Sequence, residues 1–462
     1  MIRPKPMPVP TPVVPKTNEV VLLAAGFQEE SPVSMLELDF SKPVRLSIIN
    51  HHGKLLRIRL EPTIAEIPAA VKQDISRKFR KFTFTKGNTY AEMSFYGQGK
   101  MLNPLIGTSP TQLPRIGIPF QNKDEDFPLK VGETIAEGLT YHQDRPRTAK
   151  GFADAHVLKL DPTSPNVRAF PVLAYEGICQ KETLSSMTKR YQAVAGINGA
   201  YFTNRGDPIG TLIINKKLIS SPLYNRSVFG LTESSQPVFG NPDFSGRLVC
   251  KSVSLDIDAV NQPRAEDSLV IFTPEYARST LTSNHGLELV LVKNRVVGIQ
   301  PSDAVIPPDG VVVSAGGRKA GQLSRVKLGD IVRLDYQIHQ PWNAITHAVC
   351  GGPRLTENGK VKITGTTEKF SSSIVRGRHP RTAVAITHEG NLLFVVVDGR
   401  SKRSSGMTLS ELAEYLIRLG VKEAINMDGG GSSSMFLKNR IVNKPSDGRE
   451  RPISNGIIFV TK

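Results

Sequence analysis

The sequence predicts a mixed α/β (α+β) fold in which helices cover the sheet of one large domain, preceded by a small β-rich N-terminal domain. The run Leu392–Val397 is apolar at every position, as strands buried on both faces are. A helical pattern at residues 408–420 and a second short strand at Ala424–Met427 follow it. Near the N-terminus, residues 44–60 show instead the period-two alternation of a β-hairpin.

The length of 462 residues favours several domains, and changes in composition and hydrophobic pattern along the chain suggest where they divide. Six prolines among the first sixteen residues predict an extended tail over residues 1–18. Residues 19–135 mix short strands with Gly- and Pro-rich loops, which indicates a small β-rich accessory domain. Longer alternating strands begin near residue 136, so residues 136–462 are predicted to form the large domain.

Charge and composition indicate an anionic partner. The chain has 59 Lys and Arg against 42 Asp and Glu, a formal charge of +17 and a pI near 9.7. It carries no zinc-finger spacing, no RNA-binding signature and no long basic helix, so we expect no nucleic acid. A phosphorylated or acidic glycan fits this charge, although a basic surface that only confers solubility would give the same balance. The three cysteines are too few and too widely spaced for a disulfide scaffold.

The sequence shows no segment with the roughly 18 apolar residues that a membrane span needs. The candidate core of a signal peptide, Val20–Ala25, is only six residues long and lacks a basic flank. The mature form of an exported protein would show the same features.

Two carboxylates follow the predicted strands of the large domain. Asp398 ends the apolar run, and Asp428 ends the second strand. Between them, Thr408 and Glu411 form a capping box and Gly420 ends the helix. If the two strands are parallel neighbours, both carboxylates lie at the sheet edge where open α/β sheets bind ligands.

A glycine-rich loop follows Asp428. Gly429, Gly430 and Gly431 leave backbone N–H groups uncovered, and the hydroxyls of Ser432 and Ser433 add donors, so the loop could cradle a phosphate or a sugar hydroxyl. A flexible bend is the simpler interpretation. The Gly-Lys-Ser/Thr ending of a nucleotide P-loop is missing.

Six motifs occur in a fixed order along the chain. They are Asn198-Gly-Ala-Tyr-Phe202, Gly351-Gly-Pro353, Pro380-Arg-Thr-Ala383, Asp398-Gly399, Asn426-Met-Asp-Gly-Gly-Gly-Ser-Ser433 and Arg451-Pro-Ile453. Together they resemble the phosphodiester glycosidase family over residues 138–462, with Ala200 and Met427 departing mildly from its pattern. The resemblance implies a hydrolase that cleaves a sugar from phosphate in a sugar-1-phosphodiester, in an extracytoplasmic or cell-envelope setting.

The resemblance and the chemistry of phosphate suggest a role for each site residue. Phosphate is a weakly basic leaving group, so one essential carboxylate and a cationic cradle suffice; we assign Asp428 as the carboxylate and Asp398 as its support or a sugar ligand. Arg381 is expected to clamp phosphate, and Asn198 to bind a sugar hydroxyl or phosphate, unless it only caps a turn. Further substrate-binding candidates are Gly352, Thr382, Gly429, Gly430, Gly431, Ser432, Ser433, Arg264, Glu288 and Arg451. Glu288 reads equally well as an ordinary strand residue.

The sequence leaves several points open. Neither an inverting nor a retaining course is favoured. No cofactor is required; Asp398 and Asp428 could supply oxygens to a cation such as calcium, but no EF-hand spacing supports this. The substrate could instead be a phosphate-linked envelope polymer or an unrelated glycoside. From a different functional class, the chain could be a non-catalytic envelope protein that binds anionic glycans.

Overall fold

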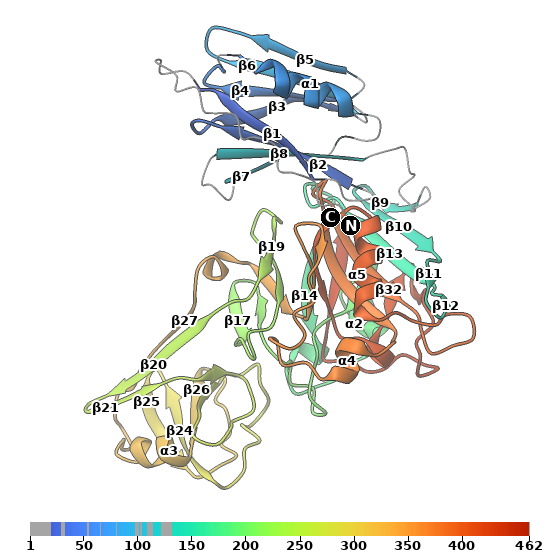
Figure 1. Cartoon of the computed structure of the whole chain (residues 1–462). Coiled ribbons are helices and arrows are strands. Elements are labelled where there is room, and N and C mark those ends of the chain that lie inside the picture. Colours follow the sequence, from blue (N-terminus) through green and yellow to red (C-terminus); the bar gives the residue numbers. More distant parts are fainter. Residues whose placement is uncertain are drawn as a thin grey trace, which may run out of the picture. The chain divides into compact units, whose positions relative to one another are not determined.

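The chain divides into two compact units, Met1–Phe127 and Pro128–Lys462, which Figure 1 shows in blue and in green to red. This computed structural model describes residues 20–28, 33–52, 55–64, 66–79, 81–97, 101, 104–108, 114–121 and 132–461. The Pro-rich tail predicted at 1–18 lies outside these residues.

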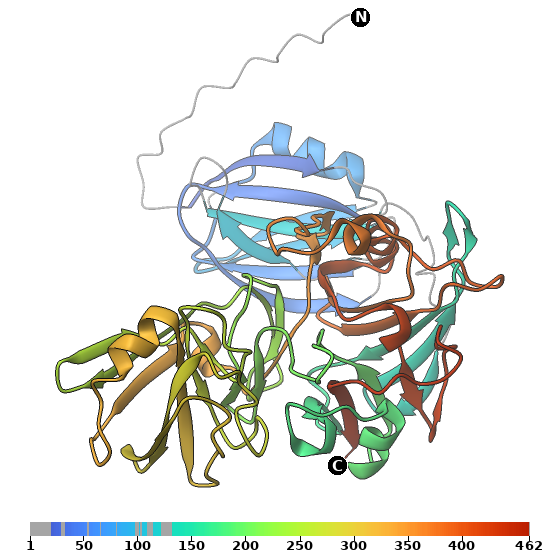
Figure 2. The ribbon, with the colours of Figure 1, turned by 90° about the horizontal axis from the view of Figure 1, so that it is seen from below.

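The N-terminal unit contains two four-stranded antiparallel sheets, ordered β1-β2-β8-β7 and β3-β4-β6-β5. Their strands are β1 (Leu22–Gln28), β2 (Val33–Phe40), β3 (Arg45–His52), β4 (Leu55–Glu61), β5 (Lys81–Lys86), β6 (Ala91–Tyr96), β7 (Leu105–Thr108) and β8 (Pro114–Gln121). The pairing of β3 with β4 confirms the hairpin that the alternation predicts. Helix α1 (Ala69–Lys78) packs Ile75 into the core of this unit, and Figure 2 shows it along the strands.

Two sheets of the C-terminal unit position the predicted site. The larger has the order β30-β29-β33-β31-β32-β13-β10-β9 and the smaller β14-β36-β15-β34-β35. The larger contains β9 (Glu133–Ala136), β10 (Leu139–Asp144), β13 (Ala155–Leu160), β29 (Arg354–Glu357), β30 (Lys360–Val361), β31 (Arg381–Thr387), β32 (Leu392–Val397) and β33 (Val421–Asn426). The smaller contains β14 (Val167–Leu173), β15 (Ala195–Asn198), β34 (Met435–Leu437), β35 (Arg440–Ile441) and β36 (Asn455–Thr461).

Strand β32 is apolar throughout because both of its faces are buried. Leu392, Phe394 and Val396 join the core shared with the smaller sheet. The alternate residues of β32 pack in a second core with helix α5 (Leu409–Arg418). The capping box between Thr408 and Glu411 begins this helix as predicted. A helix therefore covers one face of the sheet, and a second sheet covers the other.

This arrangement corrects the predicted fold class. The chain is mostly β, built from small antiparallel sheets, and the described residues hold only five α-helices, so it is not an α/β sheet covered by helices. The apolar run of β32 predicted burial on both faces correctly. It could not distinguish a covering helix from a covering sheet, because both bury the same side chains.

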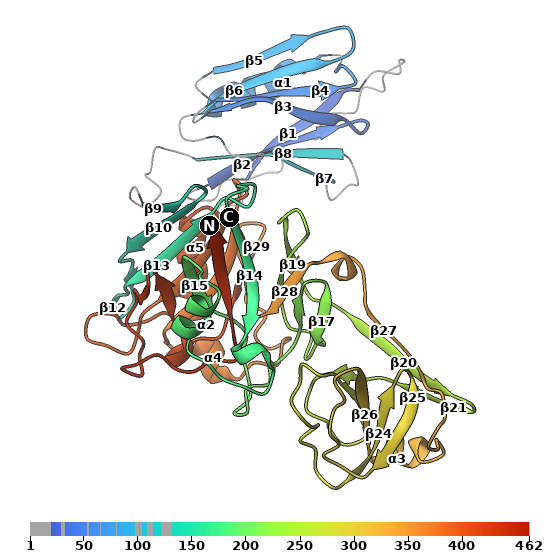
Figure 3. The same ribbon diagram turned by 180° about the vertical axis from the view of Figure 1, so that it is seen from behind.

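The remaining elements form a five-stranded sheet, ordered β17-β16-β28-β18-β19, and a lobe at residues 244–338 with a core of its own. Figure 3 shows the lobe around β24 to β26. The sheet contains β16 (Leu212–Ile214), β17 (Lys217–Ser220), β18 (Val228–Leu231), β19 (Pro237–Gly240) and β28 (His347–Cys350). The lobe contains β20 (Phe244–Cys250), β21 (Val253–Asp256), β22 (Ala259–Val260), β23 (Leu269–Phe272), β24 (Gly286–Val292), β25 (Arg295–Gln300), β26 (Gly310–Gly316), α3 (Gly317–Leu323) and β27 (Arg333–Ile338).

The short elements of the C-terminal unit are β11 (Arg147–Thr148), β12 (Gly151–Phe152), α2 (Leu184–Arg190), α4 (Ser372–Arg376) and the 3₁₀ turns η1 (Ala174–Glu176), η2 (Trp342–Ala344) and η3 (Gly430–Ser432). Among the helices of the described residues, none has the length and apolar character of a membrane span.

Candidate active site

Strands β32 and β33 run in the same direction but are not neighbours. Strand β31 lies between them and pairs antiparallel with both. Asp398 and Asp428, which follow β32 and β33, therefore lie at the same edge of the sheet, one strand apart. The two strands are therefore not the parallel neighbours that the sequence analysis considered. The two carboxylates nevertheless lie at the same sheet edge, as that arrangement would have placed them.

Asn198 connects the two sheets at this edge. It ends β15 of the smaller sheet, and its Nδ2 donates to the backbone oxygen of Asp428 at 2.7 Å. Its Oδ1 accepts from the Thr382 hydroxyl at 2.8 Å and from the Ser434 amide at 3.1 Å. Because these bonds occupy the buried amide from both ends, its position fixes the backbone that carries Asp428. The Thr382 hydroxyl also lies 3.2 Å from that of Ser433.

The Asp428 carboxyl is partly exposed and poorly solvated. Burial by the surrounding protein raises its pKa from 3.8 to about 6, against the opposing effects of the Gly429 amide and the Arg451 charge. The Gly429 amide donates to Oδ1 at 2.9 Å. A pKa near 6 leaves the group ionised at neutral pH and still able to accept a proton.

Two of the glycines after Asp428 are required, Gly429 by close approach to backbone and Gly430 by its backbone conformation. Gly430 has φ +64°, and a Cβ on Gly429 would lie 2.9 Å from the Pro380 oxygen. A Cβ on Gly431 would lie 2.2 Å from both the Arg451 guanidinium and Asp447, which pair with each other. The amides of residues 429, 430, 432 and 433 all donate within the chain. Most of the N–H groups that were expected to cradle a ligand are therefore already occupied.

The carboxylate of Asp398 is hydrogen-bonded to the loop at residues 443–444. Its carboxylate accepts from Asn443 Nδ2 at 3.0 Å and from the Lys444 amide at 3.0 Å. His156 Nε2 lies 3.7 Å from its Oδ2, and His156 Nδ1 is 2.8 Å from the Tyr141 hydroxyl. Asp398 and His156 line a cavity of about 580 Å³ that does not include Asp428. Since Asn443 also donates to the Ser433 oxygen at 3.1 Å, Asp398 supports the glycine loop indirectly.

The buried guanidinium of Arg381 is held by backbone oxygens. Nε donates to Met407 at 2.9 Å, and Nη2 donates to Ile374 at 3.0 Å and to Gly377 at 2.6 Å. Burial lowers the pKa of Arg381 to about 10. Nη2 thus anchors the segment around α4 and Nε the backbone just before α5, which leaves Nη1 as the remaining nitrogen for the phosphate clamp that the sequence suggests.

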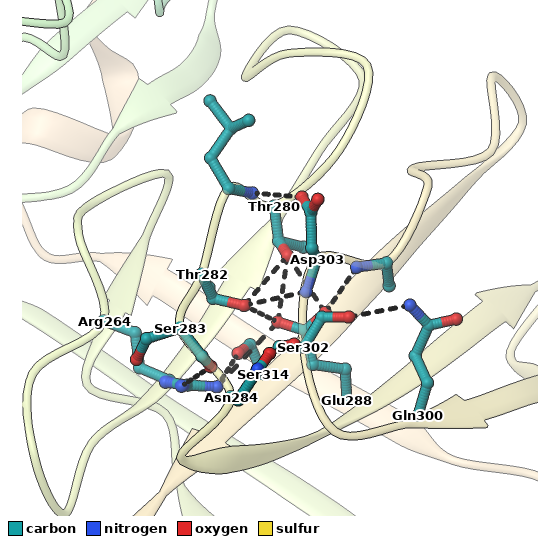
Figure 4. Close-up of polar contacts among 12 residues, drawn as sticks. Arg264, Thr280, Thr282, Ser283, Asn284, Glu288, Gln300, Ser302, Asp303 and Ser314 are labelled. Atoms are coloured by element: carbon teal, nitrogen blue, oxygen red, sulfur yellow. Dashed lines mark hydrogen bonds and ion pairs between the residues drawn. The ribbon is translucent and has the colours of Figure 1, made fainter.

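Arg264 and Glu288 lie in the lobe, in a polar network of their own (Figure 4). Arg264 donates to the Ser314 hydroxyl at 2.8 Å and to the Ser283 oxygen at 2.9 Å. Fully buried Glu288 accepts from three groups, Thr280 Oγ1, Thr282 Oγ1 and the Ala304 amide, and lies 3.9 Å from Arg264. These contacts remain within the lobe and do not include the residues around Asp428.

Two further residues stand beside Asp428. Asn426 Nδ2 lies 2.7 Å from the Tyr201 hydroxyl, which donates to the Gly352 oxygen at 3.2 Å. Burial raises the pKa of Tyr201, and the Asp428 charge adds to the increase. The buried Asn426 Oδ1 and Ser432 Oγ have no hydrogen-bond partner within the described part of the chain. Both Tyr201 and Asn426 fall inside motifs quoted from the sequence, which could have singled them out.

A metal site is not apparent in this arrangement. Over the residues that the structure describes, no three His, Cys, Asp or Glu side chains gather closely enough to hold an ion. The sequence-based suggestion of calcium therefore gains no ligand set here.

Residues 286–460 match the family model described as phosphodiester glycosidase. The resemblance to this family is confirmed. The matched segment includes Arg381, Asp398, Asp428 and Arg451, whereas Asn198 and Arg264 precede it.

Among curated relatives, mouse N-acetylglucosamine-1-phosphodiester alpha-N-acetylglucosaminidase is 31% identical over 159 residues, which are 31% of this chain and 30% of the relative. Across the curated relatives the matching segments span 12 to 30% of the relative's own length.

Solved structures show the fold over more of the chain. A hypothetical protein from Synechocystis aligns with a TM-score of 0.66 at 21% identity, covering 96% of this chain and 81% of the other. A "putative exported protein" from Burkholderia pseudomallei aligns with a TM-score of 0.59 at 18% identity, covering 90% and 96%.

Proposed function

We propose that the chain hydrolyses a sugar-1-phosphodiester, releasing the sugar from phosphate, with Asp428 as the essential carboxylate. The observation that carries this proposal is the environment of Asp428: a carboxyl with a pKa near 6, next to polar atoms that have no partner in the described chain. It lies within the segment that matches the phosphodiester glycosidases. Unpaired buried polar groups are costly, and ligand-binding sites are where proteins retain them.

In this mechanism the bond between C1 of the sugar and the phosphate oxygen breaks, and its electron pair stays on the phosphate. A water oxygen forms the new bond to C1 and gives its proton to Asp428, which is ionised at neutral pH. The phosphate needs little protonation because it is a weak base, so a second carboxylic acid is not required. This agrees with Asp398, whose carboxylate already accepts from Asn443 and Lys444.

We also propose that the substrate is a phosphorylated or otherwise anionic glycan outside the cytoplasm. The excess of 17 positive charges supports an anionic substrate through electrostatic steering. The description of the Burkholderia structure as a "putative exported protein" supports the location.

A panel of sugar-1-phosphodiesters tests the proposal. We expect the purified protein to release free sugar from at least one member, in the presence or absence of chelator, and Asp428→Asn to release it on the order of 10³-fold more slowly. Phosphate-free glycosides of the same sugars are the matched control and should be poorer substrates. Binding without turnover by both proteins would instead identify a non-catalytic glycan-binding protein. The absence of both binding and turnover across the panel would refute the proposed substrate class.

A further inference from the structure

Arg226 is a buried arginine whose charge is not paired. Its residue is 9% exposed, and its Nε and Nη1 are buried without a hydrogen-bond partner in the described residues. The carboxylate of Glu368 is bonded to the next residue, Ser227, and not to Arg226. It accepts from the Ser227 amide at 2.8 Å, the Ser227 hydroxyl at 2.7 Å and the Arg354 amide at 3.0 Å. A desolvated guanidinium in this state is costly unless an anion completes it.

Aromatic rings hold the Arg226 guanidinium in place. Its Cζ lies 4.1 Å from the ring centroid of Phe370 and 5.5 Å from those of Tyr201 and Tyr224. Ring faces orient a guanidinium and stabilise its charge. They do not provide the hydrogen-bond acceptors that an anion would offer to its N–H groups. The guanidinium is thus oriented, while its Nε and Nη1 keep no hydrogen-bond partner in the described residues.

The backbone around this arrangement is braced. Glu368 ties the Ser227 amide to the loop that carries Phe370. Gly352 has φ +101°, and a Cβ there would lie 2.2 Å from Glu368 Oε2 and 2.9 Å from the Phe370 ring. The glycine at position 352 is therefore needed for this packing.

Tyr201 connects Arg226 to the proposed reaction site. Its ring contacts Arg226, while its hydroxyl bonds to Asn426. The charge of Asp428 raises the pKa of Tyr201, and the charges of Arg381 and Arg226 lower it. Tyr201 therefore contacts Arg226 through its ring and, through its hydroxyl, the side chain of Asn426, two residues before Asp428.

We propose that Arg226 is the phosphate-binding residue of this site. It would bind the phosphate oxygens through the N–H groups that lack a partner, while Asp428 accepts the proton of the water that attacks the sugar carbon. The inference deepens the proposed function and rests on it for the reaction, but the binding of phosphate itself does not depend on catalysis. Arg381, with its Nε and Nη2 donating to backbone oxygens, would position the neighbouring segment instead.

Calorimetric titration of the full-length protein with inorganic phosphate tests this assignment. We expect Arg226→Gln to weaken phosphate binding by about tenfold or more, the scale of a lost charge-assisted hydrogen bond, and Arg226→Lys to weaken it less. The matched control is Arg247→Gln, which removes the same charge from an exposed arginine paired with Asp256 and should bind as wild type does. If Arg226→Gln does not fold, Arg226→Lys serves as the test.

Kinetics separate this inference from the proposed function. On an active phosphodiester, Arg226→Gln should raise KM and lower kcat/KM, with a smaller effect on a phosphate-free glycoside. Loss of phosphate binding in Arg226→Gln, in a wild-type protein that cleaves no phosphodiester, would support the phosphate site and refute the reaction. Wild-type phosphate affinity in both Arg226 variants, or no binding to the wild type, would overturn the assignment and indicate internal water around the guanidinium.

Discussion

Two arginines with buried side chains in the C-terminal unit, Arg264 and Arg226, differ in whether the polar groups around them have hydrogen-bond partners. In the lobe, Arg264 donates to Ser314 and Ser283, and Glu288 accepts from hydroxyls and a backbone amide. Beside β33, Arg226 and Asn426 keep buried polar atoms without partners. A satisfied network stabilises a fold, whereas an unsatisfied one costs stability and requires another reason to persist.

The difference separates residues that looked alike in the sequence. Arg264 and Glu288 were candidates for substrate binding because of their place in the family resemblance. Their contacts are those of a structural network within the lobe. Arg226, by contrast, lies outside the six family motifs, and no local pattern distinguishes it from the other arginines.

The largest effect is expected for Asp428→Asn, which removes the carboxylate and keeps its size. We predict a loss of kcat on the order of 10³-fold, as for removal of a general base. In the wild type, kcat/KM should fall as the pH drops through about 6, because Asp428 must be ionised. Activity close to wild type in steady-state assays of this variant would exclude Asp428 from the mechanism.

The same substitution should change stability in a pH-dependent way. The folded-state pKa of Asp428 is raised from 3.8 to about 6, so ionisation penalises the folded state, and stability is lost as the pH rises between these values. Relative to wild type, Asp428→Asn should therefore be stabilised by about 3 kcal/mol at pH 8 and by about 0.5 kcal/mol at pH 4. Thermal melts at both pH values measure this, and an equal difference at both would contradict the raised pKa.

Arg381→Lys distinguishes a phosphate clamp from a positioning residue. Lysine keeps the charge but cannot reach all three backbone oxygens, so we predict a loss of about 10²-fold in kcat/KM together with a lower Tm. If Arg381 positions its segment, the inhibition constant of inorganic phosphate should stay near the wild-type value. A large increase in that constant at unchanged Tm would restore Arg381 as the clamp.

Glu288→Gln should lower stability and leave activity nearly unchanged. It leaves Arg264 without its nearest carboxylate and weakens the bonds from Thr280 and Thr282, so the free energy of unfolding should fall by about 2 kcal/mol. Activity on a small phosphodiester should change less than twofold at temperatures where the variant is folded. Reduced turnover with an unchanged urea midpoint would instead place Glu288 in substrate binding.

Local patterns predicted single elements well. The capping box, strand β32 and the hairpin β3–β4 are confirmed because each depends on side chains that are close in sequence. The fold class was wrong because the partner that covers β32, the smaller sheet, comes from segments before residue 199 and after residue 434. Apolar periodicity does not identify such a partner.

The candidate site was predictable where its residues belong to the sequence motifs. Asn198, Thr382 and Asp428 were selected from motifs, and the structure brings them together. Arg226 and Phe370 could not be selected, because their relation depends on loops about 140 residues apart. The glycine loop shows a further limit, since its amides could be counted from the sequence but not their partners.

The smallest effect is expected from removing the N-terminal unit. The cores of the two units share no residue, and all the residues that we place in the reaction lie beyond residue 197. A chain beginning at Pro128 retains β9, which pairs with β10, and should fold with kcat/KM on a small phosphodiester within about twofold of the full-length value. Binding to a large anionic polymer is the contrasting measurement, where a loss on truncation would assign the N-terminal unit to attachment. A truncated chain that melts cooperatively but is inactive on the small substrate would show that residues before 128 complete the site, and that the difference between the satisfied and unsatisfied networks is not sufficient to locate it.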